Sequence, residues 1–382
     1  MDPIIIIGTG LAGYTLAREF RKLDKSTPLT LISSDHGGFY SKPMISSALA
    51  SNKSAGDLIT TTADQMAIQL NAEIVTHTNV NSIDAPGKSI SFSTQTRRFS
   101  KLVLALGARQ RDLTLSGDGA AAVMTVNDVD DYGRFRGALE NARNVVIVGA
   151  GLVGCEFSND LLRAGFNVHL VSHSELPLDR LAPPPIGAAL KAALVDEGVH
   201  WHGGATATSA HRQGNALRMT LSDGADVVAD VALSATGLIP KTELATRAGI
   251  AISRGIVADR YLNTNAEDIF ALGDCAEING TLMPYVMPLM NQARALAKTL
   301  TGDRTALVYP VMPVVVKTPS YPIVVAPPAP GSQGIWQHKS IAGGLRSLCV
   351  GANDLVLGFA LGGAATAEKT ALSKTLSAQV LY

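Results

Sequence analysis

The chain has 382 residues, which is enough for two or three domains at roughly 150 residues each. Hydrophobic residues make up 46% of the sequence and charged residues 17%, a balance that argues against disorder. Lysine plus arginine and aspartate plus glutamate both total 32, so the net charge is zero. The composition therefore gives no indication that nucleic acid or an anionic membrane is a partner.

The cysteines and the apolar stretches argue against further classes of protein. Cys155, Cys275 and Cys349 are far apart in the sequence, so a disulfide framework, a zinc ribbon and a dithiol motif are all unsupported. The opening MDPIIIIG lacks the basic region of a secretory signal, and the weakly polar run at 355–367 is too short to span a bilayer. We therefore expect a cytoplasmic protein that does not insert into a membrane.

The first element in chain order is a short aliphatic strand that runs into a glycine-rich turn and a helix, in PIIIIGTGLAGYTLAREF at 3–20. In the dinucleotide-binding GxGxxG motif, the first glycine permits the tight turn, the second admits a diphosphate and the third lets the helix pack on the strand. A second buried strand at 29–33 completes a βαβ unit. Asp35 follows that strand and is a candidate ligand of the adenosine ribose.

The same scheme recurs in NVVIVGAGLVGCEFSNDL at 144–161, with a following strand at 168–172. One isolated motif would be a plain glycine turn about as often as a nucleotide site, but two copies in the same context favour two nucleotide sites. No arginine lies in the segment 172–175 that ends the second strand, where it could bind a 2′-phosphate, and this favours NADH over NADPH. Glu175 is either the displaced ribose acid or a solvated loop carboxylate.

Other segments add candidate residues. Asp274 follows an aliphatic strand at 269–272, where it is either a ligand for polyol hydroxyls or an exposed loop acid. Lys317 lies in a β-branched run, so its ammonium group either reaches solvent at a sheet edge or meets a negative group. His200 and His202 alternate in a predicted strand and are interpreted as an ordinary strand face.

Two further regions indicate smaller β units. The region 74–100 is typical of a small antiparallel insert, and the tail from about 307 is typical of a mostly β domain.

Four motifs in this order, GTGLAG, GAGLVGCE, ATGLIP and IFALGDCAE, resemble the two-dinucleotide FAD/NAD(P)H oxidoreductases of the glutathione-reductase-like superfamily. The resemblance implies an α/β fold with two Rossmann-like three-layer dinucleotide-binding domains and a smaller C-terminal α+β domain. It places the FAD-binding domain at 1–112 and 239–306, the NADH-binding domain at 113–238 and a C-terminal interface domain at 307–382.

Further features select a branch of this superfamily. No CxxxxC follows the first glycine motif, and YSKP carries Lys42 where peroxide-reducing and oxidase members carry a cysteine. YSKP together with KTPSYP at 317–322 resembles the rubredoxin reductases of alkane-hydroxylating bacteria, with flavorubredoxin reductases as close relatives. This implies hydride transfer from NADH to FAD and single-electron transfer to rubredoxin, which feeds an alkane hydroxylase system.

The sequence leaves open three alternative functions and the oligomeric state. The acceptor could instead be flavorubredoxin or a [2Fe–2S] ferredoxin, because the donor side is common to all three. From another class, the chain could be an NADH-sensing binding flavoprotein similar to the relatives of apoptosis-inducing factor. The protein is either a monomer or a homodimer.

The resemblance also assigns functional residues. Lys42, near flavin N5 and O4, and Glu156, where flavin and nicotinamide meet, are expected to be catalytic. Asp274 would hold the ribityl chain, and Val286 and Lys317 would meet the pyrimidine end of the flavin. The residues expected to bind FAD are Gly8, Thr9, Gly10, Leu11, Ala12, Gly13, Ser33, Ser34, Asp35, Lys42, Val80, Gly107, Glu156, Asp274, Val286 and Lys317. Those expected to bind NADH are Gly149, Gly151, Leu152, Gly154, Glu175 and Gly237, and no metal ligand is predicted.

Overall fold

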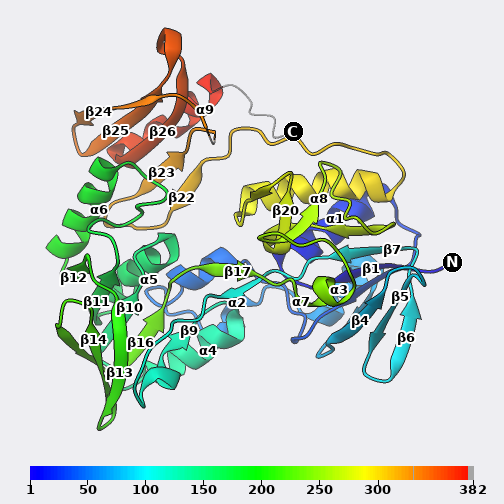
Figure 1. Cartoon of the computed structure of the whole chain (residues 1–382), viewed down its shortest axis with the longest axis horizontal. Helices are drawn as coiled ribbons and strands as arrows, with labels where there is room; N and C mark the ends of the chain where they lie inside the picture. The colour runs from blue at the N-terminus through cyan, green and yellow to red at the C-terminus, as the bar shows by residue number, and fades with distance from the viewer. Residues whose placement is uncertain (330, 377–382) are drawn as a thin grey trace.

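The computed structural model describes residues 1–329 and 331–376. The chain forms three parts, which we name the amino-terminal, central and carboxy-terminal domains (Figure 1). Two antiparallel strands, β8 (Ala108–Gln110) and β17 (Leu238–Pro240), carry the chain from the amino-terminal domain into the central domain and back. Among the described residues, no helix is both long and apolar enough to cross a membrane.

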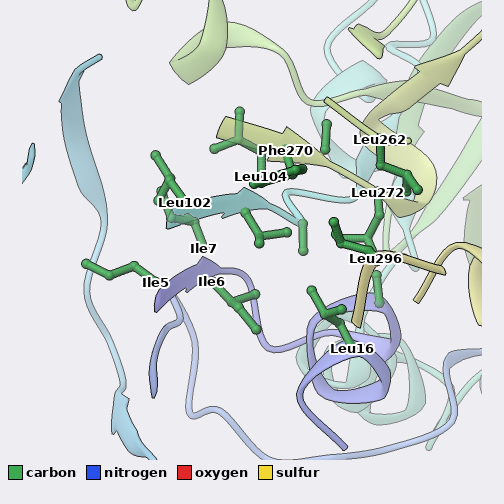
Figure 2. Packing of buried hydrophobic residues seen from close by; sticks show 14 of the residues in the cluster. Ile5, Ile6, Ile7, Leu16, Leu102, Leu104, Leu262, Phe270, Leu272 and Leu296 are labelled. Carbon is green, nitrogen blue, oxygen red and sulfur yellow. The ribbon is translucent and has the colours of Figure 1, made fainter. Parts of the chain in front are cut away.

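The amino-terminal domain is built on a five-stranded parallel sheet in the order β19-β7-β1-β2-β3. Its strands are β1 (Ile4–Ile7), β2 (Leu29–Ile32), β3 (Glu73–Val75), β7 (Lys101–Leu104) and β19 (Ile269–Ala271). Every residue of β1 and β2 is buried, as expected for parallel strands covered on both faces. Figure 2 shows Leu16 of α1 (Leu11–Leu23) and Leu296 of α8 (Val286–Leu300) close to the side chains that the sheet contributes to the core.

Smaller elements complete this domain. The insert predicted at 74–100 is confirmed as a three-stranded antiparallel sheet. Helix α3 begins after Thr62, whose hydroxyl accepts from the Gln65 backbone while the Gln65 side chain accepts from the Thr62 backbone in a capping box. The remaining elements are α2 (Ala55–Leu58), α3 (Ala63–Leu70), β4 (Val80–Asp84), β5 (Ser89–Phe92), β6 (Gln95–Arg98), α7 (Glu243–Arg247), β18 (Ile256–Ala258), β20 (Ala276–Ile278) and β21 (Thr281–Leu282).

The central domain repeats the parallel sheet in the order β12-β11-β10-β16-β9. Along β10, Val145 and Ile147 face the helices, whereas Val146 and Val148 face a three-stranded antiparallel sheet on the other side. The strands of the parallel sheet are β9 (Met124–Thr125), β10 (Asn144–Val148), β11 (Asn167–Ser172), β12 (His200–Gly203) and β16 (Val231–Ser234). The covering elements are α4 (Val129–Ala138), α5 (Leu152–Arg163), α6 (Pro184–Asp196), β13 (Ala207–Gln213), β14 (Ala216–Leu221) and β15 (Asp226–Ala229).

The carboxy-terminal domain is the mostly β unit that the sequence predicts. Its five strands pair antiparallel in the order β22-β23-β26-β25-β24. Val316, Ile323 and Ala360 of this sheet belong to the same buried cluster as the helical face of the central domain, so the two domains share a core. The elements are β22 (Val314–Val316), β23 (Ile323–Ala326), β24 (Ile335–Ile341), β25 (Gly344–Val350), β26 (Val356–Gly363) and α9 (Lys369–Thr375).

The third glycine of each motif lies where a helix crosses a strand. A Cβ atom on Gly13 would be 1.9 Å from the carbonyl oxygen of Gly8, and one on Gly154 would be 1.8 Å from that of Gly149. These separations are far below van der Waals contact, and both obstructing atoms are backbone. The close packing of α1 and α5 on their strands therefore requires glycine at both positions.

Gly154→Ala should destabilise the central domain by about 3 kcal/mol, because the added methyl forces α5 away from β10. The matched control is Gly137→Ala in α4, where an added Cβ would meet no atom within 4 Å. That change should be neutral or stabilising by about 0.5 kcal/mol, because alanine favours the helix. Chemical unfolding followed by circular dichroism measures both, and equal midpoints for the two variants would contradict the packing argument.

Candidate functional site

The two glycine turns have the same geometry. Gly8 has φ +117° and Gly149 has φ +112°, in the region that favours glycine. By contrast, a Cβ on Gly10 or Gly151 would meet no protein atom within 4 Å, so the backbone there is open. Each of these open glycines precedes a helix, whose first N–H groups and positive potential suit an anion. The residues present at both turns therefore fit the diphosphate of a dinucleotide.

A chain of hydrogen bonds orients the acid beside the first turn. The Thr9 hydroxyl donates to the Ser33 hydroxyl at 2.6 Å, and Ser33 donates to Asp35 at 2.6 Å. The Gly37 backbone N–H donates to the same carboxylate oxygen of Asp35 at 2.8 Å. Only one of the two Asp35 oxygens is occupied by these bonds, so the other can accept from the hydroxyls of a ribose.

The other predicted residues lie at or beside the ends of strands and helices in both domains. The Thr78 backbone N–H donates to the Ser33 carbonyl at 2.8 Å, which places the start of β4 at Val80 close to the acid. Ser34 is exposed, and Leu11 and Ala12 begin α1. Gly107, with φ +70°, leads into β8, and Val286 is the first residue of α8. In the central domain, Leu152 begins α5, and Gly237 has φ +106°.

Lys42 and Asp274 form an electrostatically coupled pair. Burial lowers the pKa of Lys42, and the nearby Asp274 charge opposes that shift. Burial raises the pKa of Asp274, while the Lys42 charge lowers it. The Lys42 ammonium group donates to the Asn127 side-chain oxygen at 2.8 Å, and Asn127 donates to the Ala108 carbonyl at 2.9 Å. Asn127 therefore orients Lys42, although no pattern in the sequence indicated this residue.

Glu156 joins three parts of the chain. Its side chain is only 2% exposed and accepts from the Ser46 hydroxyl and from the Lys317 ammonium group. The Lys317 backbone N–H donates to the other carboxylate oxygen at 2.8 Å, and the ammonium group also reaches the Ser46 hydroxyl at 2.9 Å. Of the two roles open to Lys317 from the sequence, the structure selects the pairing with a negative group. Ser46 lies in the short 3-10 helix Lys42–Ser47, so this cluster reaches the segment that carries Lys42.

Two further buried polar residues follow Glu156 on α5. Asp160 accepts from the backbone N–H groups of Leu49 at 2.9 Å and Ala50 at 3.0 Å. Asn159 is fully buried and accepts from the Ser320 backbone N–H at 3.2 Å. These contacts are not predicted from the sequence, although polar residues three and four positions after Glu156 are a usable signal, because they lie on the same side of a helix as Glu156. Helix α5 is thereby bound to both the amino-terminal and the carboxy-terminal domain.

The histidines form a separate cluster. The His169 ring stacks on His200 at 4.5 Å and on His202 at 5.4 Å between centroids. Burial, followed by the neighbouring histidines, lowers the pKa of His169 to about 4, and burial also lowers the pKa of His202. Within residues 1–329 and 331–376, no group of three or more histidine, cysteine or acidic side chains is arranged to hold a metal ion. The cluster is consistent with the strand face that the sequence predicts.

Comparison with known proteins identifies the class. A family model described as pyridine nucleotide-disulphide oxidoreductase matches residues 2–297, and one described as rubredoxin binding C-terminal domain matches residues 306–376. The chain belongs to the pyridine nucleotide-disulphide oxidoreductase family. This confirms the predicted fold of two Rossmann-like domains and a smaller C-terminal domain.

Individual relatives extend the likeness over nearly the whole chain. The chain is 46% identical to rubredoxin-NAD(+) reductase of Alcanivorax borkumensis, with 99% of both chains covered. It is 43% identical to rubredoxin-NAD(+) reductase of Acinetobacter baylyi, which covers 98% of this chain and 97% of the relative. Among solved structures, the ferredoxin reductase for the CYP199A2 system from Rhodopseudomonas palustris has a TM-score of 0.88 and 25% identity, over 99% of this chain and 96% of that one.

Glu156→Ala should lower the free energy of unfolding by about 3 kcal/mol, because it removes one partner of a buried, hydrogen-bonded ion pair. The matched control is Glu19→Ala, which breaks the exposed Glu19–Lys22 pair of α1 and should cost less than about 0.5 kcal/mol. Denaturant unfolding measures both changes. A loss in Glu156→Ala no larger than in Glu19→Ala would show that the buried carboxylate does not hold the domains together.

Proposed function

We propose that this protein is a flavoprotein reductase that takes electrons from NADH through FAD and delivers them one at a time to rubredoxin. The observation that carries the proposal is the match of residues 306–376 to a rubredoxin binding domain, directly after the match of residues 2–297 to the oxidoreductase family. The names of the relatives from Alcanivorax borkumensis and Acinetobacter baylyi support it. An alkane hydroxylase as the final recipient rests on the resemblance of YSKP and KTPSYP, and a cytoplasmic location rests on the lack of an apolar run long enough to span a bilayer.

We assign FAD to residues 1–112 and 239–306, NADH to 113–238 and contact with the acceptor to 307–382. The open backbone at Gly10 and Gly151 supports one nucleotide in each of the first two units. The antiparallel pairing of β8 with β17 supports boundaries at the crossing between them. A bound FAD supplies the redox chemistry, since a flavin takes up two electrons together and releases them singly.

In this proposal the residues around the first turn bind and polarise the cofactor. Asp35, oriented by Ser33, accepts from the adenosine ribose. Asp274, beside Lys42, holds hydroxyls of the ribityl chain. The half-buried Lys42 ammonium group, fixed by Asn127, presents a positive charge to the bound cofactor. The role of these residues is therefore electrostatic, and none forms a covalent bond.

Helix α5 positions the second nucleotide. Its N-terminus at Gly151 receives the diphosphate of NADH, while Glu156 and Asp160 attach the same helix to the segment that carries Lys42. A nucleotide bound at that N-terminus is therefore held at a fixed distance from the first site. Holding two reactants in a fixed alignment lowers the activation barrier, because the entropy of bringing them together has already been lost on binding.

Lys42→Met should retain FAD but slow its reduction by NADH by about tenfold to a hundredfold, because the stabilising charge is lost. Since burial lowers the pKa of Lys42, the wild-type rate should fall as pH rises, at a lower pH than for an exposed lysine. The rate of the Lys42→Met variant should not show this fall with rising pH. Anaerobic stopped-flow absorbance measures both rates, with the exposed Lys53→Met as control. An unchanged rate in Lys42→Met would exclude the electrostatic role.

The acceptor is tested by mixing NADH-reduced protein with rubredoxin or with a [2Fe–2S] ferredoxin, at low and at moderate salt. We expect fast, salt-sensitive reduction of rubredoxin, because rubredoxins are generally acidic and charge complementarity accelerates association. Equal or faster reduction of ferredoxin would assign the protein to the ferredoxin alternative. Very slow reduction by NADH itself would instead favour the NADH-sensing alternative.

A further inference from the structure

The two glycine turns can be aligned residue by residue through one hydrogen bond that both contain. In the amino-terminal domain, the Gly8 backbone N–H donates to the Ile32 carbonyl at 2.8 Å. In the central domain, the Gly149 backbone N–H donates to the Val171 carbonyl at 2.8 Å. Ile32 is the last residue of β2 that pairs with β1, and Val171 is the last residue of β11 that pairs with β10. The segments that follow these two residues therefore occupy equivalent places.

The aligned segments differ at the position where the ribose acid is expected. The third residue after the shared acceptor is Asp35 in the amino-terminal domain and Ser174 in the central domain. Ser174 has no charge, but its hydroxyl donates to the Asp179 carboxylate at 2.5 Å. The His173 imidazole lies 3.2 Å from the same oxygen. A carboxylate is therefore present within one hydrogen bond of the equivalent position, although it comes from further along the chain.

The backbone brings Asp179 back to the glycine turn. Leu178, directly before it, donates its N–H to the Ala150 carbonyl at 3.0 Å, inside the second glycine motif. Leu178 has φ +58° and is 2% exposed, so the loop is anchored at this residue. The Asp179 side chain itself is 36% exposed and remains accessible to a ligand. The Ser174 hydroxyl lowers the pKa of Asp179, so its carboxylate is ionised at neutral pH.

Glu175, the other acid of this loop, is directed elsewhere. Its carboxylate oxygens lie against Gly203 and Gly204 at the end of β12, so closely that a Cβ on Gly204 would be 2.4 Å from one of them. Strand β12 is the edge of the parallel sheet, whereas the glycine turn follows the central strand β10. Glu175 therefore lies toward the sheet edge, and Asp179 lies beside the turn.

We propose that Asp179, oriented by Ser174 and His173, binds the adenosine ribose hydroxyls of NADH and excludes the 2′-phosphate of NADPH. This inference rests on the proposed function and names the residue that selects its nucleotide. An ionised carboxylate accepts from both hydroxyls of the ribose and repels a phosphate in the same place. Ser174 is a positioning residue, because it acts through Asp179.

The test is anaerobic reduction of the bound flavin in the holoprotein by NADH and by NADPH, without any electron acceptor. In Asp179→Asn the second-order rate constant with NADH should fall about tenfold or more, because charge-assisted hydrogen bonds are lost. The ratio of the NADPH to the NADH rate constant should rise at least about tenfold. Ser174→Ala should shift this ratio in the same direction by less.

A matched control is Asp118→Asn, which removes another exposed aspartate of the central domain that lies 3.4 Å from a histidine, His211. It should leave the ratio unchanged. Glu175→Gln is the competing variant, and a shift of the ratio in that variant but not in Asp179→Asn would overturn the proposal. Retained flavin content and an unchanged melting temperature establish that each variant is folded.

Failure of the proposed function can be told apart from failure of this inference. Because the half-reaction contains no electron acceptor, the ratio of the NADPH to the NADH rate constant can be measured even if rubredoxin is not the acceptor. If neither nucleotide reduced the wild-type flavin, the proposed function would fail. Calorimetric binding of ADP-ribose and of 2′-phospho-ADP-ribose to wild type and Asp179→Asn would still decide the inference. Equal preference in the two proteins would overturn it.

Discussion

The arrangement of the three domains depends on one buried carboxylate. Glu156 accepts simultaneously from the Lys317 backbone, the Lys317 ammonium group and the Ser46 hydroxyl. Removing an ionised group from water costs several kcal/mol, so such a group is tolerated only where its partners are all in place. Because those partners come from different domains, the carboxylate is satisfied only when the central helix, the Lys42 segment and the carboxy-terminal sheet are assembled together.

Helix α5 extends this constraint along its length. Its apolar side contributes Phe157 and Leu161 to the core of the central domain, while Asn159 and Asp160 are buried against other domains. The same helix begins at the glycine turn that fits a diphosphate. One rigid element thus connects this glycine turn to both neighbouring domains, so the separation between the turn and those domains is fixed.

The duplicated turn shows which features of a nucleotide site are fixed by geometry and which are free to change. Both copies keep a first glycine at positive φ, an open second glycine and a crowded third glycine, because a backbone carbonyl lies against the first and third positions and no protein atom lies near the second. The acid beside the turn is less constrained. Asp35 stands at the expected place in the amino-terminal domain, whereas in the central domain Ser174 stands there and its hydroxyl donates to Asp179 from the following loop. A carboxylate can reach one small region of space from several places on the backbone.

The sequence by itself determined the local units: both βαβ turns, the antiparallel insert at 74–100 and the mostly β tail. These follow from aliphatic runs, glycine spacing and proline positions, which act over a few residues. Only the tertiary structure paired Glu156 with Lys317, Lys42 with Asn127 and Asp160 with the backbone at Leu49. These partners are separated by 161, 85 and 111 residues, and a hydrogen bond requires proximity in space rather than any spacing along the chain.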